Sequence, residues 1–193
     1  MKNKLTDLKT TITKEEITEL PLISFAGDIL VIDSLNGIDE IIDEIKTQRV
    51  LGFDTESKPA FKKNVPNKLS LIQISSEFKA YLFRVNKIGF PDSLIRLLSE
   101  KHIIKIGLGI QQDLSLLKKI RNFEPGGFIE LKEISQKAGV EDFSLVKLAA
   151  IILNHRVSKS QQLSNWDREM LSEAQIRYAA TDAWLCLKIA NEL

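Results

Sequence analysis

Four acidic residues occupy positions where unpaired carboxylates are costly, namely Asp54, Glu56, Asp113 and Asp182. Asp54 and Glu56 belong to a strand-like run, and alternate strand residues point to the same face of a sheet. Asp113 follows another apolar run, and Asp182 lies in the last predicted helix. Burial of a carboxylate without a partner is unfavourable, and no matching set of Lys or Arg lies nearby in the sequence. The pattern therefore predicts a cationic partner from outside the chain, and a divalent metal ion suits carboxylate oxygens.

Each of these residues also has a simpler interpretation. Asp113 could cap the N-terminus of a helix. Asp54 and Glu56 could lie on an edge strand that faces water. Asp182 could pair with a distant Lys or Arg, and Tyr178, one turn before it, could be a core tyrosine with a satisfied hydroxyl. The four acids can be explained without a metal ion only if all of these independent interpretations are correct at once. We therefore favour the metal site.

The hydrophobic pattern predicts the elements that position these residues. Strand patterns occupy the segments 29–33, 50–56, 69–74, 80–85, 103–107 and 128–131, and helical patterns occupy 37–47, 91–99, 113–120, 132–137, 143–153 and 172–193. The close spacing of 69–74 and 80–85 predicts antiparallel neighbours. Further along, strands alternate with helices, which predicts parallel additions to the sheet. We therefore predict one α/β domain with a mixed central sheet of about five strands flanked by helices.

The last helix is the most informative segment. Ser172 and Gln175 have the spacing of a capping box, as do Thr13 and Glu16 near the N-terminus. At about 100° per residue, the small and apolar side chains form a broad stripe, and Asp182 falls inside it. Arg177, Thr181 and Lys188 are predicted to face solvent on the opposite side. A charged residue within an apolar stripe is typical of a functional site.

Composition limits the class of protein. The chain has 193 residues, 44% of them hydrophobic and 27% charged, which suits one globular domain. The formal net charge of +1 argues against a globally basic, histone-like binder. No apolar run reaches the roughly 18 residues of a membrane span. The single cysteine, Cys186, and an N-terminus without an apolar core predict an intracellular, cytoplasmic protein without an intrachain disulfide.

Three motifs resemble those of the DnaQ-like, or DEDD, superfamily of 3′–5′ exonucleases. They are Phe53-Asp54-Thr55-Glu56, the run from Gly107 to Asp113, and Tyr178-Ala-Ala-Thr-Asp182-Ala183. A Tyr four residues before the last Asp is similar to the tyrosine subclass. The segments 163–166, 171–175 and 68–74 resemble the Werner-type exonuclease domain and, more distantly, ribonuclease D. The resemblance runs from about residue 29 to residue 193 and implies a ribonuclease H-like fold. It predicts a tail or short helix at 1–20 and an exonuclease domain at 21–193.

The resemblance also implies a mechanism. Two Mg²⁺ ions, for which Mn²⁺ would substitute, would be bound by Asp54, Glu56, Asp113 and Asp182. By resemblance, Asp54 bridges both ions, Glu56 and Asp182 hold the ion that carries the attacking water, and Asp113 serves the ion at the leaving group. Tyr178 orients the nucleophile or helps to deprotonate it. The partner would be a nucleic acid with a free 3′ end, and the product a nucleoside 5′-monophosphate.

Residues that contact nucleic acid are harder to recognise. The candidates are Thr55, Lys62, Lys68, Trp166 and Arg168. Lys62 and Lys68 belong to a basic segment with Lys58, Lys63 and Phe61, where lysines could track phosphates and the ring could stack on a base. Arg156 and Lys159 join Arg168 as a second basic set around Trp166. Both sets could equally be solvated surface charge.

Three functions remain open on the sequence alone. The leading one is a 3′–5′ exonuclease that acts on DNA. The second is RNA 3′ trimming of the ribonuclease D kind, because no residue visibly contacts or excludes a 2′-hydroxyl. The third is a catalytically silent module that binds nucleic acid or protein, which retention of all four acids disfavours.

Overall fold

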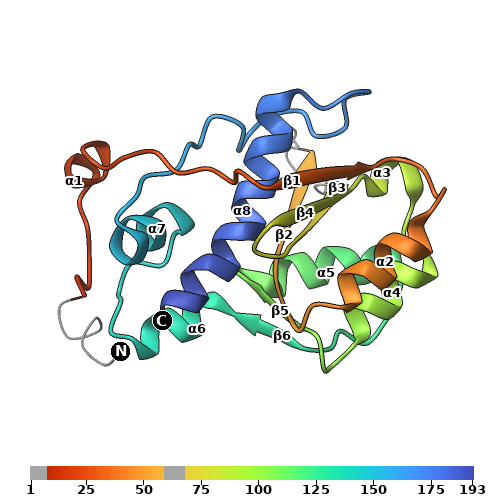
Figure 1. Cartoon of the computed structure of the whole chain (residues 1–193), viewed down its shortest axis with the longest axis horizontal. Helices are drawn as coiled ribbons and strands as arrows, with labels where there is room; N and C mark the ends of the chain where they lie inside the picture. Colours follow the sequence, from red (N-terminus) through yellow and green to blue (C-terminus); the bar gives the residue numbers. More distant parts are fainter. Residues whose placement is uncertain (1–7, 59–67) are drawn as a thin grey trace.

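The computed structural model describes residues 8–58 and 68–193, and a six-stranded mixed sheet forms its centre (Figure 1). The strands lie in the order β1-β4-β3-β2-β5-β6. Their bounds are β1 Asp28–Ile32, β2 Val50–Lys58, β3 Lys68–Ser75, β4 Lys79–Phe83, β5 Ile104–Gly107 and β6 Phe128–Glu130. The predicted α/β class is therefore confirmed, with six strands in place of about five, because β1 also joins the sheet.

Strand pairing follows the chain in two stages. β2, β3 and β4 pair antiparallel in succession, as the close spacing of β3 and β4 predicts. β5 then adds parallel to β2, and β6 adds parallel to β5. β1 pairs parallel with β4 at the opposite edge. The strand predicted to run to Val85 ends at Phe83, because Val85 begins the short helix α3.

Helices cover both faces of the sheet (Figure 1). Their bounds are α1 Lys14–Thr18, α2 Ile38–Lys46, α3 Val85–Ile88, α4 Asp92–Ser99, α5 Ile110–Ile120, α6 Leu131–Lys137, α7 Leu145–Leu153 and α8 Glu173–Glu192. α2, α4 and α5 pack their apolar sides against one face, in the cluster that contains Phe53 and Ile72. α8 covers the other face, where Leu71 and Leu82 meet Ala179 and Ala180. Both predicted capping boxes are present, at α1 and at α8.

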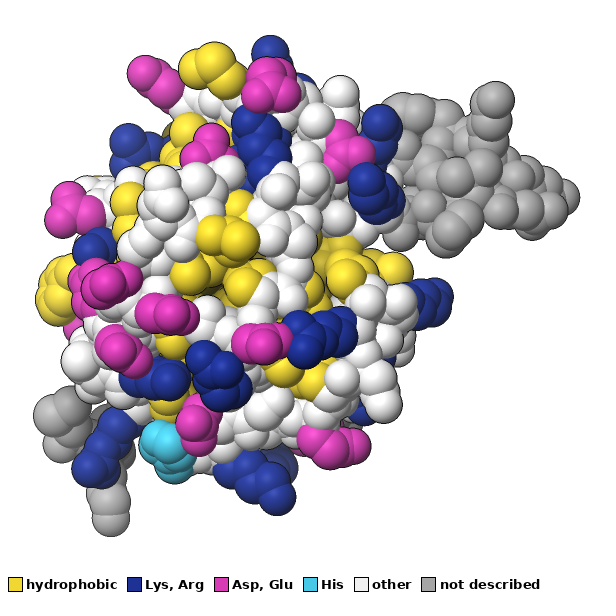
Figure 2. Space-filling view, turned by 90° about the vertical axis from the view of Figure 1, so that its right-hand side faces the viewer, with side chains coloured by type: hydrophobic (Ala, Val, Ile, Leu, Met, Phe, Trp, Pro, Cys, Tyr) yellow, Lys and Arg dark blue, Asp and Glu magenta, His cyan; other side chains and the backbone are white. Residues whose placement is uncertain are grey.

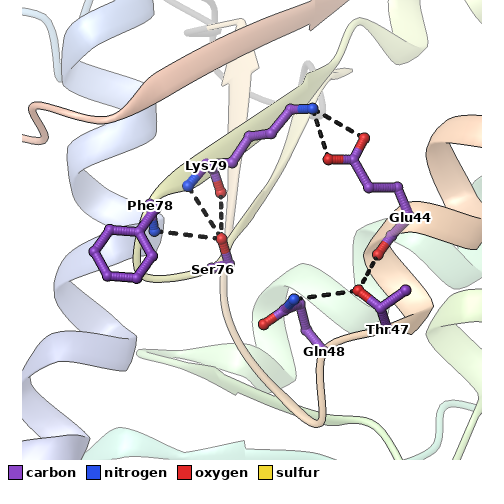
Figure 3. A network of polar contacts seen from close by, with 6 residues as sticks. All are labelled: Glu44, Thr47, Gln48, Ser76, Phe78 and Lys79. Carbon is purple, nitrogen blue, oxygen red and sulfur yellow. Dashed lines mark hydrogen bonds and ion pairs between the residues drawn. The ribbon is translucent and has the colours of Figure 1, made fainter.

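The turn between β3 and β4 is closed by polar contacts (Figure 3). The Ser76 hydroxyl accepts hydrogen bonds from the backbone N–H of Lys79 at 3.0 Å and of Phe78 at 3.4 Å. The Lys79 ammonium reaches Glu44 on α2, with Nζ 2.7 Å and 2.9 Å from the two carboxylate oxygens. These contacts hold α2 beside the hairpin, on the side of the molecule away from α7 (Figure 1).

The N-terminal segment, residues 8–25, lies along α7 and α8. The backbone N–H of Glu141 donates to the Thr10 carbonyl at 2.8 Å, and the N–H of Phe25 donates to the Thr181 hydroxyl at 3.0 Å. Arg177 donates to the Phe25 carbonyl at 2.8 Å. The prediction that Thr181 faces solvent is therefore wrong, because this segment covers that side of α8 and leaves Thr181 6% exposed.

Surface charge is mixed, in keeping with the net charge. The face shown in Figure 2 carries Lys and Arg side chains interspersed with Asp and Glu. Within residues 8–58 and 68–193, every helix is too short or too polar to cross a lipid bilayer.

Candidate active site

Three of the predicted acids converge where β2 meets α8. One carboxylate oxygen from each of Asp54, Glu56 and Asp182 lies within 4.8 Å of the others. Asp54 and Glu56 share one face of β2, as their spacing predicts. β2 is an inner strand with β3 and β5 as neighbours, so the interpretation as an exposed edge strand is wrong. Strand periodicity thus predicts the shared face of Asp54 and Glu56 correctly, and the predicted grouping of Asp182 with them is confirmed by the contact of α8 with β2.

Close packing of α8 on β2 brings Asp182 to the other two acids. Gly52 lies two residues before Asp54 on the same face of β2. A Cβ atom at Gly52 would lie 1.9 Å from the Ala183 carbonyl oxygen of α8. Only glycine permits this approach, and Asp182 is the residue next to Ala183. In the sequence, this contact is indicated by Gly52 within a strand and by the alanines along one side of α8.

Asp113 lies beside the three-acid group but outside it. α5 begins at Ile110, three residues earlier than predicted, so Asp113 lies in its first turn and Gly109 is the N-cap. The N-cap interpretation of Asp113 is therefore wrong. Instead, the Asp113 carboxylate accepts a hydrogen bond from the Thr55 hydroxyl at 2.6 Å. This bond joins α5 to the centre of the first motif and engages the hydroxyl of Thr55.

Glu130, at the end of β6, is a positioning residue that the sequence analysis missed. Its carboxylate accepts hydrogen bonds from the backbone N–H groups of Gly109 and Ile110 at 3.0 Å, and thereby supplies the cap that Gly109 lacks. It also caps α6 by accepting from Lys132. An acid at a strand end has no local sequence signal for this role, because its partners lie about twenty residues away.

The electrostatics of the site show that the acids repel one another. Burial raises the pKa of Asp54 well above its usual value, and the charges of Asp182, Asp113 and Glu56 raise it further. Burial and the charges of Asp182 and Asp113 raise the pKa of Glu56 to about 9. Burial raises the pKa of Asp182 to about 7 against a lowering hydrogen bond from Tyr178, and that of Asp113 to about 6 against the bond from Thr55. A bound cation would relieve this repulsion.

Buried cations of the protein lie elsewhere. Within the described ranges, no ion pair joins Asp54, Glu56 or Asp182 to a Lys or Arg. Asp182 therefore does not pair with a described Lys or Arg, as the simpler interpretation requires. Lys105 donates to the carbonyls of α4 residues and their C-cap. Arg84 donates to the carbonyls of residues 168 and 169. Among the described residues the three acids are therefore without an ion-pair partner, and hard carboxylate oxygens fit a divalent metal ion.

Tyr178 lies beside the acids and lines the same cavity as Asp54 and Asp182. Burial raises the pKa of its hydroxyl above the usual range, and the neighbouring acids, foremost Asp182, raise it further. The hydroxyl therefore stays protonated at neutral pH, which suits it to donate a hydrogen bond. Its ring packs 6.1 Å from that of Trp166. The remaining lining includes Lys159, Gln162 and Cys186, a buried free cysteine whose thiol pKa is raised by burial.

The predicted nucleic-acid contacts have mixed outcomes. Trp166 is only 1% exposed, so the prediction that it contacts nucleic acid is wrong; it packs under α8 as a core residue. Lys68 and Arg168 are exposed, and their role stays a prediction. Lys62, with Phe61 and Lys63, lies outside the described residues.

The second basic set separates in the structure. Arg156 donates to the Leu20 carbonyl at 2.9 Å and so secures the N-terminal segment. Lys159 lines the cavity with Asp54 and Asp182, and within the described part of the chain its ammonium makes no hydrogen bond or ion pair. The Lys58 ammonium lies 3.7 Å from the Asp167 carboxylate. Of the two basic sets, as far as the structure describes them, Lys159 is therefore the residue that lines the cavity with an unpaired ammonium.

The structure is a mixed sheet with helices on both faces, and carboxylates gather where β2 meets α8. A family model described as 3′-5′ exonuclease matches residues 29–193. The chain therefore belongs to this 3′–5′ exonuclease family, as its motifs predict.

Individual relatives agree with this assignment. The mouse bifunctional 3′-5′ exonuclease/ATP-dependent helicase WRN is 31% identical over 199 residues, which cover 97% of this chain and 14% of the mouse protein. The putative 3′-5′ exonuclease R431 of Acanthamoeba polyphaga mimivirus is 29% identical over 186 residues, which cover 86% of this chain and 44% of the viral protein. The chain thus spans less than half the length of these two relatives.

Solved structures share the fold. The Nibbler EXO domain of Aedes aegypti superposes with a TM-score of 0.80 at 22% identity, over 88% of this chain and 90% of that one. Escherichia coli RNase D superposes with a TM-score of 0.76 at 19% identity, over 86% of this chain and 45% of that one.

Proposed function

We propose that this chain is a two-metal 3′–5′ exonuclease that removes nucleoside 5′-monophosphates from the 3′ end of DNA. The observation that carries the proposal is the convergence of carboxylate oxygens from Asp54, Glu56 and Asp182, none of which forms an ion pair with a described Lys or Arg. Such oxygens are preferred ligands of Mg²⁺, and Mn²⁺ accepts the same ligands. Family membership supplies the direction of cleavage.

Each acid has a proposed role that agrees with its position. The charges of Asp182, Asp113 and Glu56 all act on Asp54, which suits a carboxylate shared by two ions. Glu56 and Asp182 would hold one ion, and Asp113, bonded to Thr55, would serve the other, directly or through water. Two divalent ions, when bound, activate a water molecule and stabilise the charge on the leaving oxygen. The protonated Tyr178 hydroxyl would orient the attacking water by donating a hydrogen bond.

The substrate would enter beside Lys159. Its ammonium is exposed at the cavity and can approach a phosphate of the bound strand. Lys68, the first residue of β3, and Arg168, two residues after Trp166, are both exposed. We propose that these two side chains contact the phosphate backbone of the substrate. We also propose that the activity is cytoplasmic, which agrees with a single buried cysteine.

RNA 3′ trimming is a second candidate. Two solved structures that share this fold are RNase D enzymes, and the one from Trypanosoma brucei is in complex with RNA U12; it superposes with a TM-score of 0.77 at 20% identity. No described residue of the cavity singles out or excludes a 2′-hydroxyl. DNA remains first because the relatives found by sequence include the WRN exonuclease and a DNA polymerase I.

A matched digestion tests the function. Single-stranded DNA, a recessed duplex and RNA of one sequence, each labelled at the 5′ end, would be incubated with Mg²⁺, with Mn²⁺ or with EDTA. The expected result is stepwise shortening from the 3′ end of DNA, abolished by EDTA and by Asp54→Ala but unaffected by Asp39→Ala, an exposed acid on α2. Faster digestion of RNA would support the second candidate. Binding without digestion in any metal would identify a silent module and contradict the proposal.

A further inference from the structure

Gln73 is a buried polar residue without a partner. It lies in the interior of β3 and is 0% exposed. Neither its amide nitrogen nor its carbonyl oxygen has a hydrogen-bond partner among the described residues. Burial of an unpaired amide is costly, so native proteins retain one only where it serves a purpose. The flanking position on the same face holds Leu71, which shows that an apolar side chain is tolerated in this layer.

The register of the sheet places Gln73 beside the acids. In the antiparallel pairing of β2 with β3, Gln73 is directly opposite Asp54. Residues opposite each other share a face, and their Cβ atoms lie about 4.5–5.5 Å apart. On its other side Gln73 is opposite Leu82, which packs with Ala179 and Ala180 of α8. The amide therefore lies in the layer between sheet and α8 that also contains the carboxylate cluster.

We propose that Gln73 is a positioning residue for Asp54: its amide, unpaired in this structure, would donate an N–H to a carboxylate oxygen of Asp54 once a divalent ion is bound. The inference rests on the proposed metal-dependent function. A donor to one oxygen favours the ionised carboxylate and directs the remaining lone pairs toward the ion. The backbone N–H of Thr55 donates to Asp54 from within β2, and Gln73 is the residue opposite Asp54 on β3. Gln73 touches neither substrate nor product in this role.

Metal affinity measured without substrate tests the inference. Gln73→Met removes the amide but keeps the length of the side chain, and Gln73→Leu is a second apolar variant should the first fold poorly. The control is Ser75→Ala. Ser75 is a buried polar residue on the same face of β3 as Gln73, but the residue opposite it on β2 is Gly52 and carries no carboxylate. The readouts are Mn²⁺ dissociation constants from electron paramagnetic resonance of free Mn²⁺, and thermal unfolding in EDTA.

We expect the apolar variants to be at least as stable as the wild type in EDTA and to bind Mn²⁺ about tenfold more weakly, with Ser75→Ala unchanged. Equal Mn²⁺ affinity in wild type and both Gln73 variants would overturn the role of Gln73 and leave the proposed function intact. An equal loss in Ser75→Ala would assign the effect to packing and overturn it as well. Absence of Mn²⁺ binding by the wild type would instead overturn the proposed function itself.

Discussion

Replacement of Glu56 by Gln should stabilise the metal-free protein, although it removes a proposed metal ligand. Burial and the neighbouring acids raise the pKa of Glu56 from 4.5 to about 9. The folded protein therefore keeps this proton up to about pH 9, whereas the unfolded chain releases it near its ordinary pKa. Across this interval, rising pH favours the unfolded chain by about 1.4 kcal/mol per pH unit.

The magnitude follows from the same shift. pH 7 lies about 2.5 pH units above the ordinary pKa of 4.5, and this difference corresponds to about 3 kcal/mol of lost stability. Gln carries no titratable proton, so Glu56→Gln should recover up to that amount. For a domain of this size, 1 kcal/mol corresponds to about 2–4 °C in midpoint temperature, which gives a rise of about 6–12 °C. At pH 5 the expected gain is below about 1 kcal/mol, because little of the interval has been crossed.

The assay is thermal and urea unfolding in EDTA between pH 5 and pH 8, for wild type, Glu56→Gln and the control Glu124→Gln, an exposed residue of the segment before β6. The variant should gain stability relative to wild type as pH rises, and the control should not. Addition of Mn²⁺ should stabilise the wild type more than the variant. The electrostatic reasoning is refuted if Glu56→Gln is less stable than wild type in EDTA at pH 8, or if both have the same dependence on pH.

Three further outcomes are expected. Gly52→Ala should lower stability by about 1–3 kcal/mol and reduce activity, because the new Cβ collides with the Ala183 carbonyl of α8; an unchanged unfolding midpoint would contradict the close packing. Lys159→Ala should raise KM about tenfold with kcat little changed, whereas Lys118→Ala, in the last turn of α5, should leave both unchanged; equal effects would remove Lys159 from substrate binding. Tyr178→Phe should lower kcat about tenfold, the worth of one hydrogen bond to a charged group, with the midpoint within about 2 °C; wild-type kcat would make Tyr178 a packing residue.

Much of the fold follows from the sequence because its patterns are local. Alternation in β2 depends only on neighbouring residues and correctly predicts that Asp54 and Glu56 share a face, whereas the stripe of α8 correctly predicts that Asp182 faces the interior. Strand spacing likewise predicts the antiparallel pairing of β3 with β4. The boundary of α5 was predicted too late because the positive φ of Gly109, at 79°, allows a helix start without a polar cap residue.

The remaining features depend on contacts between distant segments. Thr181 is buried because residues 8–25 cross its side of α8, which the helix pattern does not reveal. Trp166 packs under the sheet-facing side of α8 although its neighbours in sequence are polar. Lys159 lines the cavity together with Tyr178 and Asp182 of α8, and nothing distinguishes it in sequence from other surface lysines.

Anomalous diffraction at the manganese edge, from crystals soaked with Mn²⁺ and a nucleoside 5′-monophosphate, tests the central claim most directly. The claim is that Asp54, Glu56 and Asp182 bind divalent metal as a unit. The account predicts at least one strong peak at coordination distance from oxygens of all three carboxylates, lost in crystals of Asp54→Ala. A wild-type cavity without a peak, while manganese occupies other sites of the same crystal, would contradict it.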